Sequence, residues 1–67
     1  AWYKVLGVSP DASEHDITEA NRDNMKKYHP ELTLRMGEKL QLLAKVETQK
    51  LNAARDEGLS LRRSRHA

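Results

Sequence analysis

The sequence predicts an all-α fold: a short first helix on an antiparallel helical hairpin, followed by a short C-terminal helix. Apolar residues recur at helical spacing in both halves of the chain, and no segment alternates apolar and polar residues as a strand does. Pro30 separates the two halves, because the residue before a proline is driven out of the helical region. A chain of 67 residues is long enough for one such domain and no more.

An apolar segment and a turn open the chain. Residues 2–6 read Trp-Tyr-Lys-Val-Leu, and Gly7 follows them at a position where helices commonly end. Residues 9–11, Ser-Pro-Asp, have the composition of a turn. We therefore expect a short first helix at residues 2–6 that covers the seam of the hairpin with Tyr3 and Leu6.

The second helix is expected at residues 13–28. Ser13 and Asp16 have the spacing of a capping box, in which each side chain accepts a hydrogen bond from the other residue's amide. The apolar positions of one stripe of this helix are Ile17, Ala20 and Tyr28. Asn21 and Asn24 interrupt the stripe. A buried amide needs a partner, so either both are hydrogen-bonded to the third helix or the first loop, or they form a polar seam that binds a partner.

The third helix is expected at residues 38–57, after a linker at residues 32–36. Its wide apolar face comprises Met36, Leu40, Leu43, Ala44, Leu51 and Ala54, interrupted by Glu47 and Lys50. Gly58 stands where this helix should stop, since glycine is favoured just past a helix C-terminus, and residues 59–65 then add a short basic turn. We expect one buried cluster of Tyr3, Leu6, Ile17, Leu43, Leu51 and Ala54.

Composition excludes several classes of function. The chain has no cysteine, which rules out disulfides and thiolate metal sites and fits a reducing compartment such as the cytoplasm or the mitochondrial matrix. A net charge of +2 is too small for a general nucleic-acid binder. No apolar run approaches the roughly 20 residues of a membrane-spanning helix. No Ser-His-Asp, Cys-His or glycine-rich phosphate pattern is present, so we expect neither an enzyme nor a bound cofactor.

Two charged clusters have alternative interpretations. His15, Asp16 and Glu19 could ligate a metal, but nothing in the sequence indicates the supporting residues such a site needs, so we expect none. The basic segment at residues 62–66 is expected to be solvated, and the alternative is contact with nucleic acid, an anionic membrane surface or an acidic partner. Because no methionine opens the sequence, we expect residues 1–67 to be one module of a longer protein, whose other parts would make any membrane contact.

Four segments, in order along the chain, resemble the J-domain family. Residues 2–8, Trp-Tyr-Lys-Val-Leu-Gly-Val, are similar to the family's first helix, and residues 10–13, Pro-Asp-Ala-Ser, to the start of its second. Residues 27–31, Lys-Tyr-His-Pro-Glu, match the end of that helix and its His-Pro-Asp loop, with Glu in place of Asp. Residues 51–54, Leu-Asn-Ala-Ala, resemble a segment late in the third helix. The likeness covers residues 2–57.

The resemblance implies a function and a set of site residues. J-domains bind the ATP state of Hsp70 and stimulate its ATP hydrolysis, without being enzymes or taking a small-molecule substrate themselves. They use the loop tripeptide and the basic face of the second helix. Carried over to this chain, the partner-binding residues are His29, Pro30, Glu31, Arg22, Lys26 and Lys27. The expected partner is therefore an Hsp70-type chaperone, or another protein.

The chain also departs from the family pattern. Glu31 keeps the charge of the usual Asp but moves the carboxylate by about 1.5 Å, one carbon–carbon bond. Asn21 and Arg55 replace tyrosines, Asn24 replaces a leucine, and Asp23 replaces a basic residue. These changes predict weak or absent stimulation of a generic Hsp70. A second hypothesis is therefore a J-like scaffold that no longer stimulates Hsp70, and a more distant third is a helical nucleic-acid binder.

Overall fold

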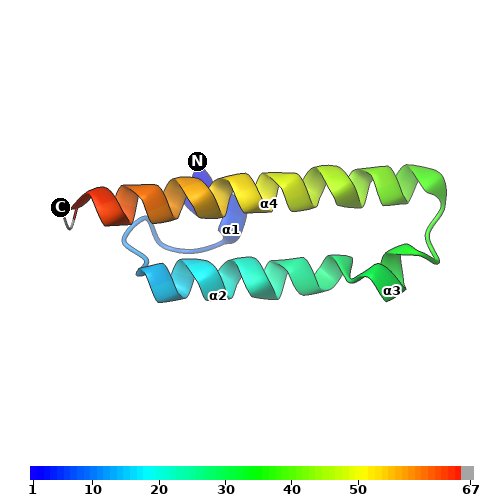
Figure 1. Ribbon diagram of the computed structural model, residues 1–67, viewed down its shortest axis with the longest axis horizontal. Coiled ribbons are helices and arrows are strands. Elements are labelled where there is room, and N and C mark those ends of the chain that lie inside the picture. The colour runs from blue at the N-terminus through cyan, green and yellow to red at the C-terminus, as the bar shows by residue number, and fades with distance from the viewer. Residues whose placement is uncertain (66–67) are drawn as a thin grey trace.

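The computed structural model describes residues 1–65, apart from the side chains of Pro30 and Arg65. Its elements are the helices α1 (Trp2–Leu6) and α2 (Glu14–Met25), the 3-10 turn η1 (Lys26–Tyr28), and the helices α3 (Pro30–Thr33) and α4 (Glu38–Arg65). Helices α2 and α4 run antiparallel, α1 packs against both, and α3 lies at the end where the chain reverses (Figure 1). Residues 1–65 contain no strand, and the predicted all-α hairpin is confirmed.

A left-handed glycine ends α1 at the predicted position. Gly7 has φ 76° and ψ 33°, a region that glycine reaches without a Cβ clash. The amides of Gly7 and Val8 both donate to the Tyr3 carbonyl at 2.9 Å. A carbonyl that the end of the helix would leave without a partner is thereby satisfied, and the chain is turned toward the loop before α2.

The predicted start of α2 is confirmed. Its end differs from the prediction, because the α-helix stops at Met25 and residues 26–28 form the 3-10 turn η1. The Asp16 amide donates to Ser13 Oγ at 3.1 Å, and the Ser13 amide donates to Asp16 Oδ2 at 3.4 Å, so the capping box is complete. The second helix ends before Pro30, as expected. Pro30, however, begins the one-turn helix α3, because its fixed φ suits a first helical position. The linker predicted at residues 32–36 is therefore partly helical.

The predicted helix stop at Gly58 is wrong, because α4 continues through it to Arg65. Among the residues that the structure describes, only Gly7 has a positive φ. Gly58 is buried, and a Cβ atom there would lie 2.7 Å from Cε3 of Trp2. Its missing side chain thus makes room for the Trp2 ring against α4. The expected short C-terminal helix is the last part of α4 and not a separate element.

The core lies where α1 packs on the hairpin. It comprises Trp2, Leu6, Ala12, Ile17, Leu51 and Ala54. The predictions for Leu6, Ile17, Leu51 and Ala54 are confirmed. Tyr3 is only partly buried, and Trp2 is the buried aromatic residue of α1, with its ring edge-to-face to that of Tyr3 at a centroid distance of 5.6 Å.

The predicted burial of Leu43 is wrong. Its side chain is 54% exposed, and that of Leu40 is 53% exposed. The predicted apolar face of the third helix assumed that the second helix would face it along its whole length. However, α2 ends at Met25, and the chain opposite the first turns of α4 forms only η1, α3 and a loop. The apolar face of α4 is therefore covered in its middle, around Leu51, and open near its start.

The expectation that the basic segment at 62–66 is solvated is wrong for Arg62. Its Nε donates to the Ala12 carbonyl and its Nη2 to the Pro10 carbonyl, so it ties α4 to the loop before α2. Arg63 forms an exposed ion pair with Glu14, from Nε to Oε1 at 2.8 Å. Residue 66 lies outside the described residues. Two arginines of the segment thus bind the chain itself.

We expect Arg62→Met to lower the free energy of unfolding by about 2 kcal/mol, because methionine keeps the aliphatic stem and removes two charge-assisted hydrogen bonds. Arg63→Met is the matched control. It should change stability by less than about 0.5 kcal/mol, since an exposed ion pair contributes little. Urea unfolding followed by circular dichroism measures both. Equal effects of the two substitutions would contradict the structural role given to Arg62.

Candidate functional site

The predicted basic face is exposed at the end of α2 and in η1. The side chains of Arg22, Lys26 and Lys27 are all exposed. Lys26 forms an exposed ion pair with Asp23, from Nζ to Oδ1 at 3.5 Å. No partner is recorded for Arg22 or Lys27 within the described part of the chain. The Arg22 and Lys27 side chains are therefore free to contact a partner. The charge of Lys26 is partly neutralised by Asp23, which stands where the family pattern has a basic residue.

The His29-Pro30-Glu31 tripeptide forms the start of α3. The His29 carbonyl accepts from the amides of Leu32 and Thr33, and the His29 Nδ1 accepts from the Glu31 amide at 3.3 Å. His29 thus caps the helix as a serine or aspartate would, with Pro30 at the first helical position. Because Nδ1 accepts, the ring proton of neutral His29 is on Nε2. The turn is therefore held by His29, and the Glu31 carboxylate takes no part in it.

His29 and Glu31 are exposed, as predicted, whereas the side chain of Pro30 lies outside what the structure describes. His29, Lys26 and Arg22 line one open groove of about 640 Å³ between α2 and α4. The structure thus brings together three of the six predicted site residues. Lys27 and Glu31 are exposed but do not line the groove. The partner-binding role of all six stays a prediction.

Of the further residues that line this groove, two form a hydrogen bond between the helices. They are Asn21 of α2 and Arg55 of α4. Arg55 Nη1 donates to Asn21 Oδ1 over a long 3.5 Å, and the Arg55 guanidinium also pairs with Asp56 Oδ1 at 3.0 Å. The floor between the polar groups is made by Met25 and Tyr28, both half-buried. A signal for this pair was present in the sequence, because both residues depart from the family pattern.

The two asparagines of the apolar stripe, Asn21 and Asn24, differ in their hydrogen bonding. Asn24 Nδ2 donates to the carbonyls of Leu6 at 3.0 Å and Ala20 at 2.8 Å, so it joins α2 to the end of α1. Asn24 is therefore hydrogen-bonded, as one interpretation predicted, but its partners lie in α1 and α2 and not in the third helix or the first loop. Asn21 is only 7% exposed, and its Nδ2 is buried without any partner. For Asn21 the hydrogen bonding is therefore incomplete.

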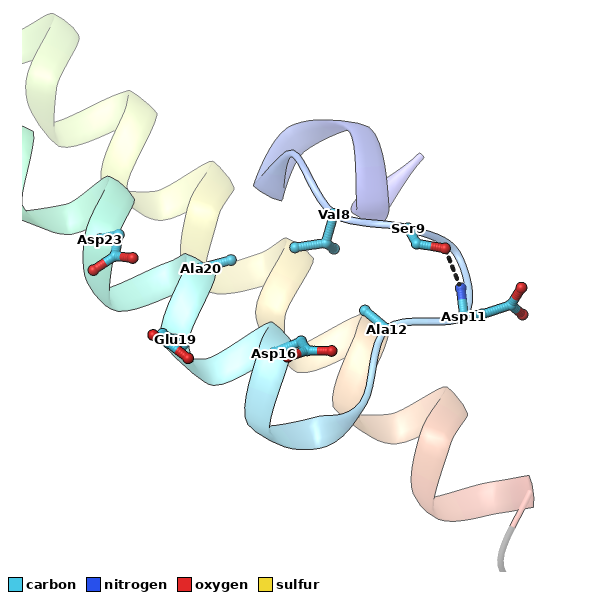
Figure 2. Close-up of a pocket in the computed structure, with 8 residues that line it drawn as sticks. All are labelled: Val8, Ser9, Asp11, Ala12, Asp16, Glu19, Ala20 and Asp23. Carbon is cyan, nitrogen blue, oxygen red and sulfur yellow. Dashed lines mark hydrogen bonds between the residues drawn. The ribbon is translucent and has the colours of Figure 1, made fainter.

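A second groove, on another flank of α2, has the opposite charge. It encloses about 460 Å³ between α2 and the loop that precedes it. Figure 2 shows Asp16, Glu19 and Asp23 along α2, with Ala20 on the same helix and Ala12 and Asp11 in the loop that precedes it. The Asp11 amide donates to Ser9 Oγ at 3.1 Å, which fixes that loop. The basic groove and the acidic groove thus share no lining residue.

Of the three residues that could ligate a metal by sequence, His15 and Glu19 lie close together. His15 Nε2 lies 3.1 Å from Glu19 Oε2 in an exposed pair, and no group of three or more potential ligands gathers among residues 1–65. Among those residues, no helix combines the length and the apolar character needed to cross a membrane.

Comparison with known proteins gives one family. The sequence model of the DnaJ domain family matches residues 1–66. The chaperone protein DnaJ of Lactobacillus acidophilus is 53% identical over 36 residues, which are 54% of this chain and 9% of the relative. The chaperone protein DnaJ of Haloarcula marismortui is 50% identical over 32 residues, 48% of this chain and 8% of the relative. The chain spans less than a tenth of these relatives' length. No solved structure matches it significantly.

Proposed function

We propose that this chain, which belongs to the DnaJ-domain (J-domain) family, is the module of a co-chaperone that docks on an Hsp70-type chaperone and stimulates its ATP hydrolysis. The module is proposed to carry out no reaction itself and to need no cofactor. Nucleotide binding and the chemistry of hydrolysis belong to the partner. The contribution of this chain is a surface that recognises the partner and holds it in the conformation that hydrolyses ATP.

The observation that carries the proposal is the continuity of the loop with the basic groove. His29 caps α3 at the point where the chain reverses, and it lines the same groove as Lys26 and Arg22. Exposed cations beside a fixed turn suit an acidic partner surface, because long-range attraction speeds the encounter and the turn fixes the orientation. This surface combines the two parts that the family uses for Hsp70.

The scaffold hypothesis remains the second candidate, and one contact favours it. The ion pair of Lys26 with Asp23 neutralises part of the basic face, and Glu31 alters the reach of the loop carboxylate. The nucleic-acid hypothesis is weakened, because Arg62 and Arg63 bind groups of the chain itself. The first two hypotheses differ in one outcome, which is acceleration of ATP hydrolysis by Hsp70.

The proposed function is tested by a single-turnover ATPase assay with an Hsp70 and this chain. We expect a weak but measurable acceleration of ATP hydrolysis that His29→Gln abolishes. Glutamine replaces both the Nδ1 atom that accepts from the Glu31 amide and the imidazole surface of His29. Lys45→Gln, an exposed change in α4 outside the groove, is the control and should leave the rate unchanged. Equal rates with and without the wild-type chain, at concentrations that saturate binding, would support the scaffold instead.

A further inference from the structure

The seam between α2 and α4 leaves one buried hydrogen-bond donor without an acceptor. Asn21 is more than nine-tenths buried, and its Nδ2 donor has no acceptor, although such an orphaned group costs roughly 1–3 kcal/mol. Its Oδ1 is held only by the long bond from Arg55. The charged groups of the neighbouring groove wall are donors as well: the guanidinium groups of Arg22 and Arg55 and the ammonium of Lys26. Arg55 and Lys26 also form solvent-accessible ion pairs with Asp56 and Asp23.

We infer that this groove binds a carboxylate side chain of the Hsp70-type partner, with Asn21 and Arg55 as the residues of this chain that select it. The inference rests on the proposed function and adds to it a second contact beside the loop. A carboxylate only accepts hydrogen bonds, and it can take a bidentate bond from a guanidinium. It supplies the acceptor that Asn21 Nδ2 lacks, once the Asn21 amide rotates toward it.

The shape of the groove favours an Asp or Glu side chain over a nucleic-acid phosphate. Its floor is formed by Met25 and Tyr28, on which the methylene groups of an acidic side chain and an apolar neighbour can pack. The groove is also continuous with the loop through His29, so one partner can occupy both. Arg55 comes from α4, and the carboxylate is therefore held from both helices of the hairpin.

Two substitutions test the groove directly. Arg55→Gln removes the guanidinium, and we expect the concentration of this chain that gives half-maximal stimulation of Hsp70 to rise about tenfold, as for the loss of one charge-assisted contact. The maximal rate should not change, because the loop is intact. Asn21→Asp places a carboxylate of the chain itself beside Arg55, and it should raise the half-maximal concentration by competing with the partner. Circular dichroism verifies that both variants fold.

Lys50→Gln is the matched control, with the same change of charge on the same helix but outside the groove, and it should leave the half-maximal concentration unchanged. If wild-type stimulation is intact and neither groove variant shifts the half-maximal concentration more than Lys50→Gln does, this inference is wrong and the proposed function stands. If the wild-type chain neither binds nor stimulates Hsp70, both fail. If Arg55→Gln weakens binding of a single-stranded DNA oligonucleotide and not of Hsp70, the groove binds nucleic-acid phosphates and the inference is overturned.

Discussion

Ile17→Ala should remove most of the stability of this domain. Ile17 is 0% exposed and is the largest fully buried side chain among the described residues, in the cluster that joins α1, α2 and α4. Truncation of a buried isoleucine costs about 2–5 kcal/mol through lost transfer energy and the cavity left behind. A chain of this length has a free energy of unfolding of about 3–10 kcal/mol. We therefore expect the variant to melt more than 10 °C below the wild type, or to be unfolded at 25 °C.

Leu43→Ala is the control for this measurement, because it removes a similar side chain from the same hairpin. The burial predicted from the sequence implies a cost of about 2–5 kcal/mol for either substitution, and the structure corrects that prediction for Leu43. Leu43 is 54% exposed, so its truncation should cost less than about 1 kcal/mol. Thermal and urea unfolding of both variants measure the difference. Two melting curves that shift equally would mean that the described core is wrong.

Glu31→Asp should raise the stimulation of Hsp70 by about tenfold at low concentrations of this chain. The turn is fixed by the His29 cap on the Glu31 amide, which is independent of the carboxylate. The substitution therefore leaves the loop in place and shortens only the reach of the charged group, by about 1.5 Å. It also reduces the rotamer freedom that is lost when the carboxylate is bound. A charge-assisted hydrogen bond between this carboxylate and a fixed cation of the Hsp70 partner is sensitive to a shift of this size.

Single-turnover ATP hydrolysis over a series of chain concentrations measures the effect of Glu31→Asp. Glu31→Gln is the matched control, since it keeps the length and removes the charge, and it should stimulate less than the wild type. Strong stimulation by the wild-type chain that the aspartate leaves unchanged would show that the reach of the carboxylate does not matter. A partner with a compensating change in its own surface would then be the explanation to test.

The features that were predicted correctly depend on neighbours in the sequence. Ser13 meets Asp16 three residues later, and Gly7 ends a helix of five residues, so dihedral preferences and short-range hydrogen bonds decide both. Pro30 acts on the residue before it. In each case the partner group lies within one helical turn, and the pattern of residue types is sufficient to predict the structure.

The features that were missed depend on neighbours far away in the chain. Gly58 is explained by Trp2, and Arg62 by a carbonyl 50 residues earlier. Glycine near the end of a helical segment is compatible with either a stop or a close contact, and only the position of α1 decides between them. The groove shows the same limit. The departures at Asn21 and Arg55 were visible in the sequence, but only the fold brings their side chains together.

The position of the core gives the two ends of the hairpin unequal local stability. Trp2 and Ile17 lie where α1 packs on α2 and α4 (Figure 1). Near the reversal at α3, by contrast, the large apolar side chains of Leu40 and Leu43 are exposed. Amide hydrogens in the first turns of α4 should therefore exchange with solvent through local opening, and those around Leu51 only through global unfolding. The first turns of α4 can then open while the folded remainder of the domain stays intact.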